Sequence, residues 1–147
     1  ENHYPTMSLA EIKEIGPRLP VADNSVLFLW ATAPKLVEGL AVMEAWGFKY
    51  KTQAIWDKQI IGMGYWFRGM HELLLVGTRG KFSPPEPSNR LPSIFSVRRG
   101  RHSSKPVPVR EWIEEAFPDA SRLELFARSH SPGWAVWGNE VLNCIEI

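Results

Sequence analysis

Cysteine is almost absent from this sequence, since Cys144 is the only one among 147 residues. A disulfide within the chain and a cysteine-rich metal site are therefore excluded, and a reducing, cytoplasmic location is expected. No apolar run approaches the roughly 18 residues of a membrane-spanning helix, and no signal peptide is visible, so no membrane partner is expected. Charge of one sign is not in excess either, because the net charge is +1. Composition alone therefore does not indicate a nucleic-acid partner.

Several signatures of catalysis are also missing. The chain has no Gly-x-x-x-x-Gly-Lys-Ser/Thr phosphate loop, no Gly-x-Gly-x-x-Gly dinucleotide fingerprint and no Gly-x-Ser-x-Gly elbow. There is no His-Glu-x-x-His, and the four histidines are scattered without the spacing of metal ligands. We therefore expect neither a P-loop nucleotidase nor a serine hydrolase nor a metal site.

What is present alternates between strand and helix patterns. Ser8 and Glu11 form a capping-box pattern before a short helix, Pro34 begins a second helix, and Val109 to Phe117 has the spacing of a third. Extended apolar runs predict strands at 26–30, 49–56, 72–77, 93–97 and 123–128, and a short one around 134–137. We predict one α/β domain over residues 1–147, with a mostly parallel sheet, helices on both faces and a right-handed βαβ unit over 26–56. The 26–30 strand is expected to be buried on both faces.

The stretch from Arg122 to Glu140 is the first candidate site. Arg128 follows a predicted strand, and Asn139 and Glu140 follow the next one. In an open α/β sheet the carboxyl edge is where ligands bind, so these side chains could converge on one polar small molecule. The alternative is a surface arginine in a loop.

Two further segments are candidates. Residues 60–70 surround Tyr65-Trp66-Phe67-Arg68 with glycines, which indicates a functional loop or, alternatively, a hairpin that packs its aromatic rings inward. Residues 98–105 form the densest basic run, which either meets phosphates at the sheet edge or is a solvated charged loop. Its cations are Arg98, Arg99, Arg101 and Lys105, with His102 among them.

Eight blocks in order resemble the MT-A70 family of S-adenosylmethionine-dependent adenine methyltransferases. They are Tyr-Pro-Thr-Met-Ser at 4–8, Leu-Phe-Leu-Trp-Ala-Thr at 27–32, Trp-Asp-Lys at 56–58, Gly-Tyr-Trp at 64–66, His-Glu-Leu-Leu-Leu-Val-Gly at 71–77, Ser-Lys-Pro at 104–106, Glu-Leu-Phe-Ala-Arg at 124–128 and Trp-Gly-Asn-Glu at 137–140. The family includes messenger-RNA N6-adenosine methyltransferases and bacterial and phage DNA adenine methyltransferases. The blocks look most like the bacterial and phage branch. The resemblance implies a Rossmann-like methyltransferase sheet.

The resemblance also implies roles for individual residues. Lys105 matches a lysine at the methionine end of the cofactor S-adenosylmethionine, and Glu124 matches an acid of the same pocket. Arg128 and Asn139 match residues that hydrogen-bond the ribose and adenine side, and Glu140 stands where the family has Gln or Glu. Ser131 departs from the messenger-RNA members, which carry an Asn there. The cofactor set is Lys105, Glu124, Arg128, Ser131, Asn139 and Glu140; the substrate set is Trp66, Arg68, Glu72, Arg98, Arg99 and Arg101, with Trp66 and Glu72 on and beside a loop that faces the target base.

The catalytic signature of the family, Asp-Pro-Pro-Trp after an apolar strand, is absent. Ser83-Pro84-Pro85-Glu86 has no strand before it and no aromatic residue after it, so we interpret it as an ordinary loop. In the family the signature precedes the Tyr-Pro-Thr-Met block, so we expect it, with the first strand of the sheet, upstream of Glu1. These residues alone would then be inactive, and an exposed sheet edge would favour pairing with another chain.

Two functions follow from the resemblance. The first is transfer of a methyl group from S-adenosylmethionine to the N6 amine of adenine in nucleic acid, with DNA favoured over RNA. The alternative is a catalytically silent methyltransferase-like subunit that binds nucleic acid for a partner, in a homodimer or heterodimer. Cofactor-contacting residues argue for the enzyme, because a silent subunit does not need them.

Overall fold

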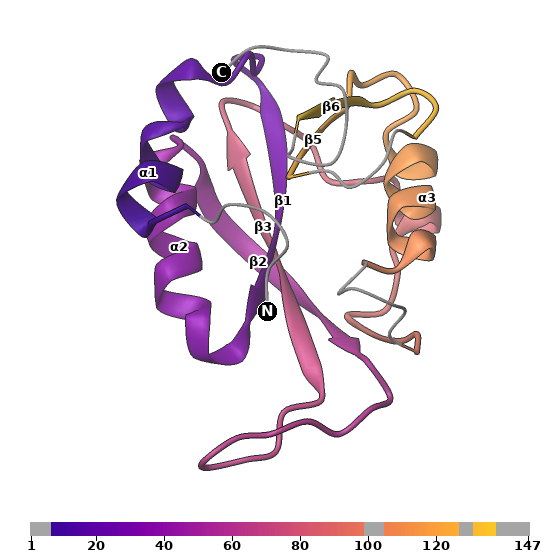
Figure 1. Ribbon diagram of the computed structural model, residues 1–147. Coiled ribbons are helices and arrows are strands. Elements are labelled where there is room, and N and C mark those ends of the chain that lie inside the picture. Colours follow the sequence, from indigo (N-terminus) through magenta and orange to yellow (C-terminus); the bar gives the residue numbers. More distant parts are fainter. Residues whose placement is uncertain (1–6, 99–104, 127–130, 138–147) are drawn as a thin grey trace.

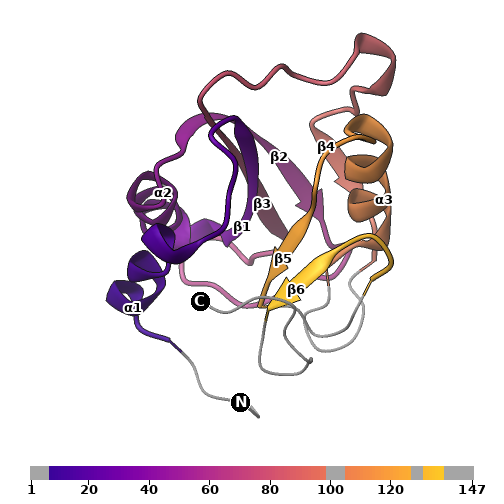
Figure 2. The same ribbon diagram turned by 90° about the horizontal axis from the view of Figure 1, so that it is seen from above.

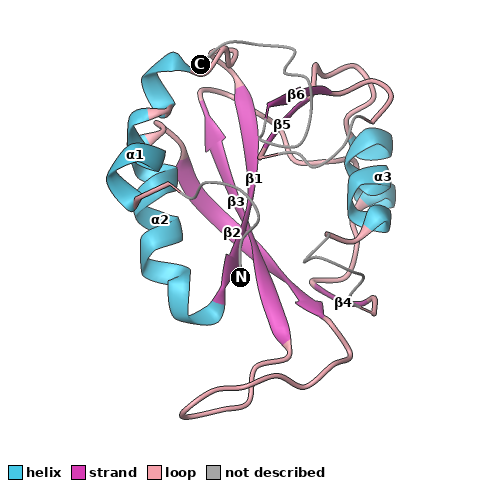
Figure 3. Ribbon diagram, in the orientation of Figure 1, coloured by secondary structure: helices cyan, strands magenta, loops and turns pink. Residues whose placement is uncertain are grey.

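A computed structural model describes residues 7–98, 105–126 and 131–137 of the chain. Among them the α-helices are α1 (Leu9–Glu14), α2 (Leu36–Ala45) and α3 (Val107–Ala116), and short 3₁₀ turns cover Gly16–Arg18, Ala33–Lys35 and Pro87–Asn89. The strands are β1 (Ser25–Thr32), β2 (Lys49–Asp57), β3 (His71–Arg79), β4 (Ile94–Ser96), β5 (Leu123–Leu125) and β6 (Ala135–Trp137). The predicted elements are therefore confirmed in type and approximate position (Figure 3).

The main sheet has four strands in the order β1-β3-β2-β4, and its direction corrects one prediction. β3 runs antiparallel to both β1 and β2, and only the short β4 pairs in parallel with β2. The sheet is therefore mixed rather than mostly parallel. The physical reason lies in the connection from β2 to β3: residues 58–70 contain no helix, so the chain returns as an antiparallel hairpin.

β1, α2 and β2 still have the order expected of a βαβ unit. Since β1 and β2 are both antiparallel to β3, they run in the same direction, with β3 inserted between them. The expected burial of residues 26–30 on both faces was wrong, because these residues are only half-buried. Within the described residues β1 pairs with β3 alone and therefore lies at the edge of this sheet.

One face of the sheet packs against α1 and α2 (Figure 1). Leu73 and Leu75 of β3 are buried there with Val42 and Met43 of α2. The Trp46 indole Nε1 at the end of α2 donates to the Ile12 carbonyl at 2.8 Å, which joins the two helices. The predicted capping box is confirmed, since Ser8 and Glu11 exchange hydrogen bonds of 2.8 and 3.1 Å.

The opposite face of the sheet carries α3, so helices lie on both faces as predicted (Figure 1). Phe28 of β1 meets the Trp112 ring of α3 edge-on at 5.9 Å. The parallel pair β5–β6 forms a second, separate sheet (Figure 2), and Leu125 and Trp137 pack against the same core as α2. The predicted strands are thus present over residues 123–125 and 135–137, whereas Phe126 is in a turn and residues 127–128 lie outside the described part of the chain. Within that part, neither strand joins the main sheet.

Two remaining expectations concern loops and membranes. Residues 83–86 lie in a loop, as predicted from Ser83-Pro84-Pro85-Glu86, although β3 ends shortly before it at Arg79. In the described part of the chain, no helix is both long and apolar enough to cross a membrane.

Candidate functional site

Several strands of the main sheet end at one edge, and polar residues gather there. β1 and β2 finish at this edge and β3 begins at it, because Glu72 of β3 pairs with Thr32 in β1 and with Trp56 in β2. β4 ends beside them, since Asp57 pairs with Ser96. The carboxyl ends of three strands that run in the same direction therefore meet here, which is where α/β sheets bind ligands.

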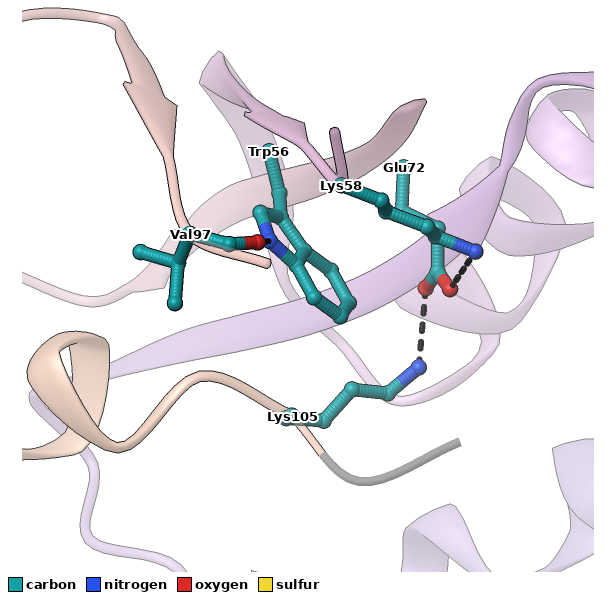
Figure 4. A network of polar contacts seen from close by, with 5 residues as sticks. All are labelled: Trp56, Lys58, Glu72, Val97 and Lys105. Carbon is teal, nitrogen blue, oxygen red and sulfur yellow. Dashed lines mark hydrogen bonds and ion pairs between the residues drawn. The ribbon is translucent and has the colours of Figure 1, made fainter. Parts of the chain in front are cut away.

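Glu72 is the centre of a buried polar network at this edge (Figure 4). Its Oε2 lies 2.7 Å from the Nζ of Lys58, and its Oε1 lies 2.8 Å from the Nζ of Lys105. The Glu72 side chain is 7% exposed, that of Lys58 17% and that of Lys105 40%. One carboxylate thus holds two lysines from different segments, and only Lys105 keeps substantial access to solvent.

Two tryptophans form an apolar wall beside these charges. Trp30 and Trp56 meet edge-on with ring centroids 5.5 Å apart. The Nζ of Lys105 lies 5.5 Å from the Trp30 ring and 6.0 Å from the Trp56 ring, within cation–π range. Trp56 is fixed in turn, because it is 1% exposed and its indole Nε1 donates to the Val97 carbonyl at 2.7 Å. Lys105 is therefore held by a carboxylate and by aromatic faces.

The electrostatics of the network favour an anionic ligand. Burial by itself would raise the pKa of Glu72, but hydrogen bonds from Lys105 and Lys58 and the charges of both lysines outweigh it and leave the pKa below 4.5. Glu72 is therefore ionised at neutral pH. Two ammonium groups share one carboxylate, so a positive charge remains, and it is most accessible at Lys105.

A small pocket continues from this network. It is lined by Trp56, Val97, Arg98 and Lys105 together with the first residues around α3. The structure therefore brings Lys105, Glu72 and Arg98 of the predicted sets to one place. Arg98 is exposed there and supplies a second cation.

Other predicted residues lie elsewhere. Glu124 is on β5, where burial raises its pKa and the charge of Arg110 opposes that rise only in part. Ser131 is buried at the turn before β6, and its carbonyl accepts from the Trp134 N–H at 3.1 Å. Trp66 and Arg68 lie in the loop between β2 and β3, where the Arg68 Nε donates to the Gly62 carbonyl. Arg99, Arg101, Arg128, Asn139 and Glu140 fall outside the described residues.

Lys58 is the site residue that the sequence prediction missed. It is the first residue after β2, and its backbone N–H donates to the Met70 carbonyl at 2.9 Å, which closes the base of the loop. An antiparallel pairing of the two segments would have indicated it, because Trp56 pairs with Glu72 and Lys58, two residues after Trp56, is then a diagonal neighbour of Glu72. The expectation of a parallel sheet concealed it.

Comparisons with known proteins show the family to which this chain is related. Residues 1–140 match the MT-A70 family model. The chain is 37% identical over 146 residues to a Type II methyltransferase, M.MunI, of Mycoplasma sp., a match covering 98% of this chain and 63% of that protein. It is 32% identical to an N(6)-adenosine-methyltransferase MT-A70-like protein of Arabidopsis thaliana, covering 94% and 21% of the two chains. It is 30% identical to the N(6)-adenosine-methyltransferase catalytic subunit METTL3 of Homo sapiens, covering 94% and 25%.

The matches cover nearly all of this chain but only part of each relative. The chain spans less than two thirds of M.MunI and about a quarter or less of the other two proteins. Nearly all of this chain is nevertheless matched, and the eight blocks that suggested the resemblance fall inside the matched residues. The chain belongs to the MT-A70 family of methyltransferases.

Proposed function

We propose that this chain forms part of an enzyme that transfers a methyl group from S-adenosylmethionine to the N6 amine of adenine in nucleic acid. The names of the relatives from Arabidopsis and human support adenine N6 as the methylated position. DNA is favoured over RNA as the substrate, because the chain is more similar to a bacterial methyltransferase than to these eukaryotic proteins.

The observation that carries this proposal is the network of Lys58, Glu72 and Lys105. S-adenosylmethionine has a carboxylate at its methionine end, and a half-exposed ammonium group beside tryptophan rings suits that carboxylate. Glu72 sets the position of Lys105, and Lys58 supplies the additional charge that leaves the site positive. The described residues therefore fit the methionine end of the cofactor.

We assign Glu124 to the ribose part of the cofactor. Burial of the Glu124 carboxyl raises its pKa. Residues with a perturbed pKa are concentrated at functional sites. Hydroxyl groups of a ribose could donate hydrogen bonds to this carboxyl. Arg128, Ser131, Asn139 and Glu140 complete the proposed cofactor set.

The cofactor supplies an electrophilic methyl group on a sulfonium. The protein's own contribution is to bind the cofactor and to orient the adenine amine in line with that methyl group. The family's Asp-Pro-Pro-Trp signature, which the resemblance associates with polarisation of the amine, is absent from these 147 residues. Trp66, Arg68, Glu72, Arg98, Arg99 and Arg101 remain the proposed contacts to nucleic acid.

Calorimetric titration with S-adenosylmethionine tests the cofactor site, using this chain, Arg128→Ala and Lys105→Met. We expect binding by the wild type and at least about tenfold weaker binding by each variant, since each loses a charge-assisted hydrogen bond. Lys81→Met is the control, because Lys81 lies in the loop after β3 and its backbone N–H, not its ammonium, bonds Asn24. Variants that bind as tightly as the wild type would contradict the assigned edge.

Methyl transfer is then measured with adenine-containing DNA and adenine-containing RNA in separate assays. We expect labelled methyl groups on N6 of adenine and a higher rate with DNA. A folded protein that binds nucleic acid but neither binds S-adenosylmethionine nor transfers a methyl group would support the silent subunit instead.

A further inference from the structure

The loop between β2 and β3 presents three consecutive aromatic side chains, which we call the aromatic tip: Tyr65, Trp66 and Phe67. Tyr65 is fully exposed, Trp66 is 93% exposed and Phe67 is 88% exposed. The sequence left open whether these rings pack inward, and the structure decides that they do not. Figure 1 shows the loop extending away from the sheet and helices.

The tip is held by a hydrogen-bonded stem. The Lys58 N–H bonds the Met70 carbonyl, the Gly62 N–H bonds the Gly69 carbonyl at 2.6 Å, and the Gly69 N–H bonds the Met63 carbonyl at 3.1 Å. The chain is tightly folded at Gly64, where an added Cβ would lie 1.9 Å from the Phe67 carbonyl oxygen. The loop therefore has a defined shape that carries the rings outward.

Exposure of three adjacent rings to water is unfavourable, because burying apolar surface stabilises a protein or complex by about 25 cal/mol per Å². Met63 is also 88% exposed, so the apolar surface extends beyond the rings. Contiguous exposed apolar surface marks a binding site more often than isolated apolar residues do. The tip therefore has the exposed apolar surface that is typical of a binding site.

The charges around the tip select the kind of molecule. No acidic residue lies between Lys58 and His71, and Arg68 is exposed beside the rings. At the base of the loop, Glu72 is neutralised by two lysines, and Arg98 is exposed on the same edge of the sheet. A polyanion with flat apolar groups matches aromatic rings surrounded by cations, and a nucleic acid strand has both features.

We propose that the aromatic tip stacks on nucleotide bases that flank the target adenine. This inference rests on the proposed function for the choice of nucleic acid as partner, and it changes the predicted role of Trp66. The loop between β2 and β3 extends away from the sheet (Figure 1) and Trp66 is 93% exposed, so we expect its ring to meet neighbouring bases rather than the base that is methylated. Rings that replace lost base stacking would keep the target strand open.

The test is binding of a fluorescently labelled single-stranded DNA, followed by anisotropy, to the wild type and to a Trp66→Ala, Phe67→Ala double variant. We expect the double variant to bind at least about tenfold more weakly, because one base stacked on a ring contributes about that factor or more. The single variant Trp66→Phe, which keeps an aromatic ring, should bind with an affinity close to that of the wild type. Tyr50→Ala is the matched control, because Tyr50 is an exposed aromatic residue at the other end of β2.

The salt dependence separates stacking from charge. The double variant should keep the slope of log affinity against log salt, whereas Arg68→Ala should reduce that slope by about 0.7 for single-stranded DNA. Equal melting temperatures of variant and wild type confirm folding, which exposed rings should not affect.

Three outcomes overturn the inference. Unchanged DNA affinity in the double variant would leave the proposed function intact and remove the stacking role. Loss of self-association or of a protein partner, with DNA binding retained, would assign the tip to a protein interface. A wild-type protein with no affinity for DNA or RNA would contradict the proposed function itself, and the stacking role with it.

Discussion

Glu72 and Glu124 show how surroundings, rather than residue type, set the behaviour of an acid in this protein. Glu72 is buried and Glu124 is half-buried. Two lysines lower the pKa of Glu72 against the effect of burial, whereas burial raises the pKa of Glu124 because only the charge of Arg110 opposes it. Glu72 is thus paired within the described residues, while Glu124 has the properties of a group that gains from a bound ligand.

Glu72→Gln removes the carboxylate that pairs with Lys58 and Lys105. Removing the carboxylate leaves two lysines close together, so we expect a loss of about 1–3 kcal/mol in the free energy of unfolding at pH 7. The pKa of Glu72 is lower in the folded state than in the unfolded one, so its stabilisation is complete well above pH 4.5 and disappears as the pH falls through the folded-state pKa. Urea unfolding of wild type and variant at neutral and acidic pH measures this. A difference independent of pH would contradict the ion pairs.

The second prediction separates the two lysines. Lys58 is 17% exposed and Lys105 is 40% exposed, so the roles of Lys58 and Lys105 should differ. Lys58→Met should reduce the free energy of unfolding more than Lys105→Met, while Lys105→Met should weaken S-adenosylmethionine binding more. Lys58→Arg, which keeps the charge, should restore most of the stability. Urea unfolding and calorimetry on the same four proteins give both quantities, and equal effects of the two Met variants on both would contradict the assignment.

At the scale of elements, the loop between β2 and β3 depends on a glycine whose place cannot be taken by another residue. Gly64→Ala would bring a Cβ to 1.9 Å from the Phe67 carbonyl oxygen, so the backbone of the aromatic tip must shift. We expect DNA affinity to fall as it does in the Trp66→Ala, Phe67→Ala double variant. The free energy of unfolding should change by less than about 0.5 kcal/mol, because the loop is exposed.

Gly69→Ala is the matched control for that change. Its added Cβ would lie 3.6 Å from the Met63 carbonyl oxygen, an ordinary contact distance. DNA affinity should therefore stay at the wild-type level. Equal losses of affinity in both glycine variants would show that loop flexibility, and not the shape of the tip, matters.

At the scale of the whole molecule, the order of strands predicts where the structure opens. β3 is paired on both sides, whereas within the described residues β1 is paired only with β3 and β5 only with β6. Amide hydrogen exchange followed by NMR should show the slowest exchange in β3, where Leu75 is fully buried, and faster exchange at alternate residues of β1. Equal protection of β1 and β3 in this chain would contradict an open edge.

The family and most local structure were determined by the sequence itself. The capping box at Ser8, the periodicity of residues 109–117 and the apolar runs of the strands depend on nearest neighbours along the chain, and each of them formed as predicted. Through the resemblance, the sequence assigned Lys105 to the cofactor set and Glu72 to the substrate set, and the structure joins these two residues in one ion pair.

Only the tertiary structure decided how those elements combine. The insertion of β3 between β1 and β2, the separate β5–β6 pair and the ion pair of Lys58 with Glu72 all depend on contacts between distant residues. Strand order is set by the burial of whole faces and by pairing between residues far apart in the chain, and a local pattern does not record these contacts. The direction of the aromatic tip was undetermined for the same reason, because an aromatic run has one sequence whether it faces a core or solvent.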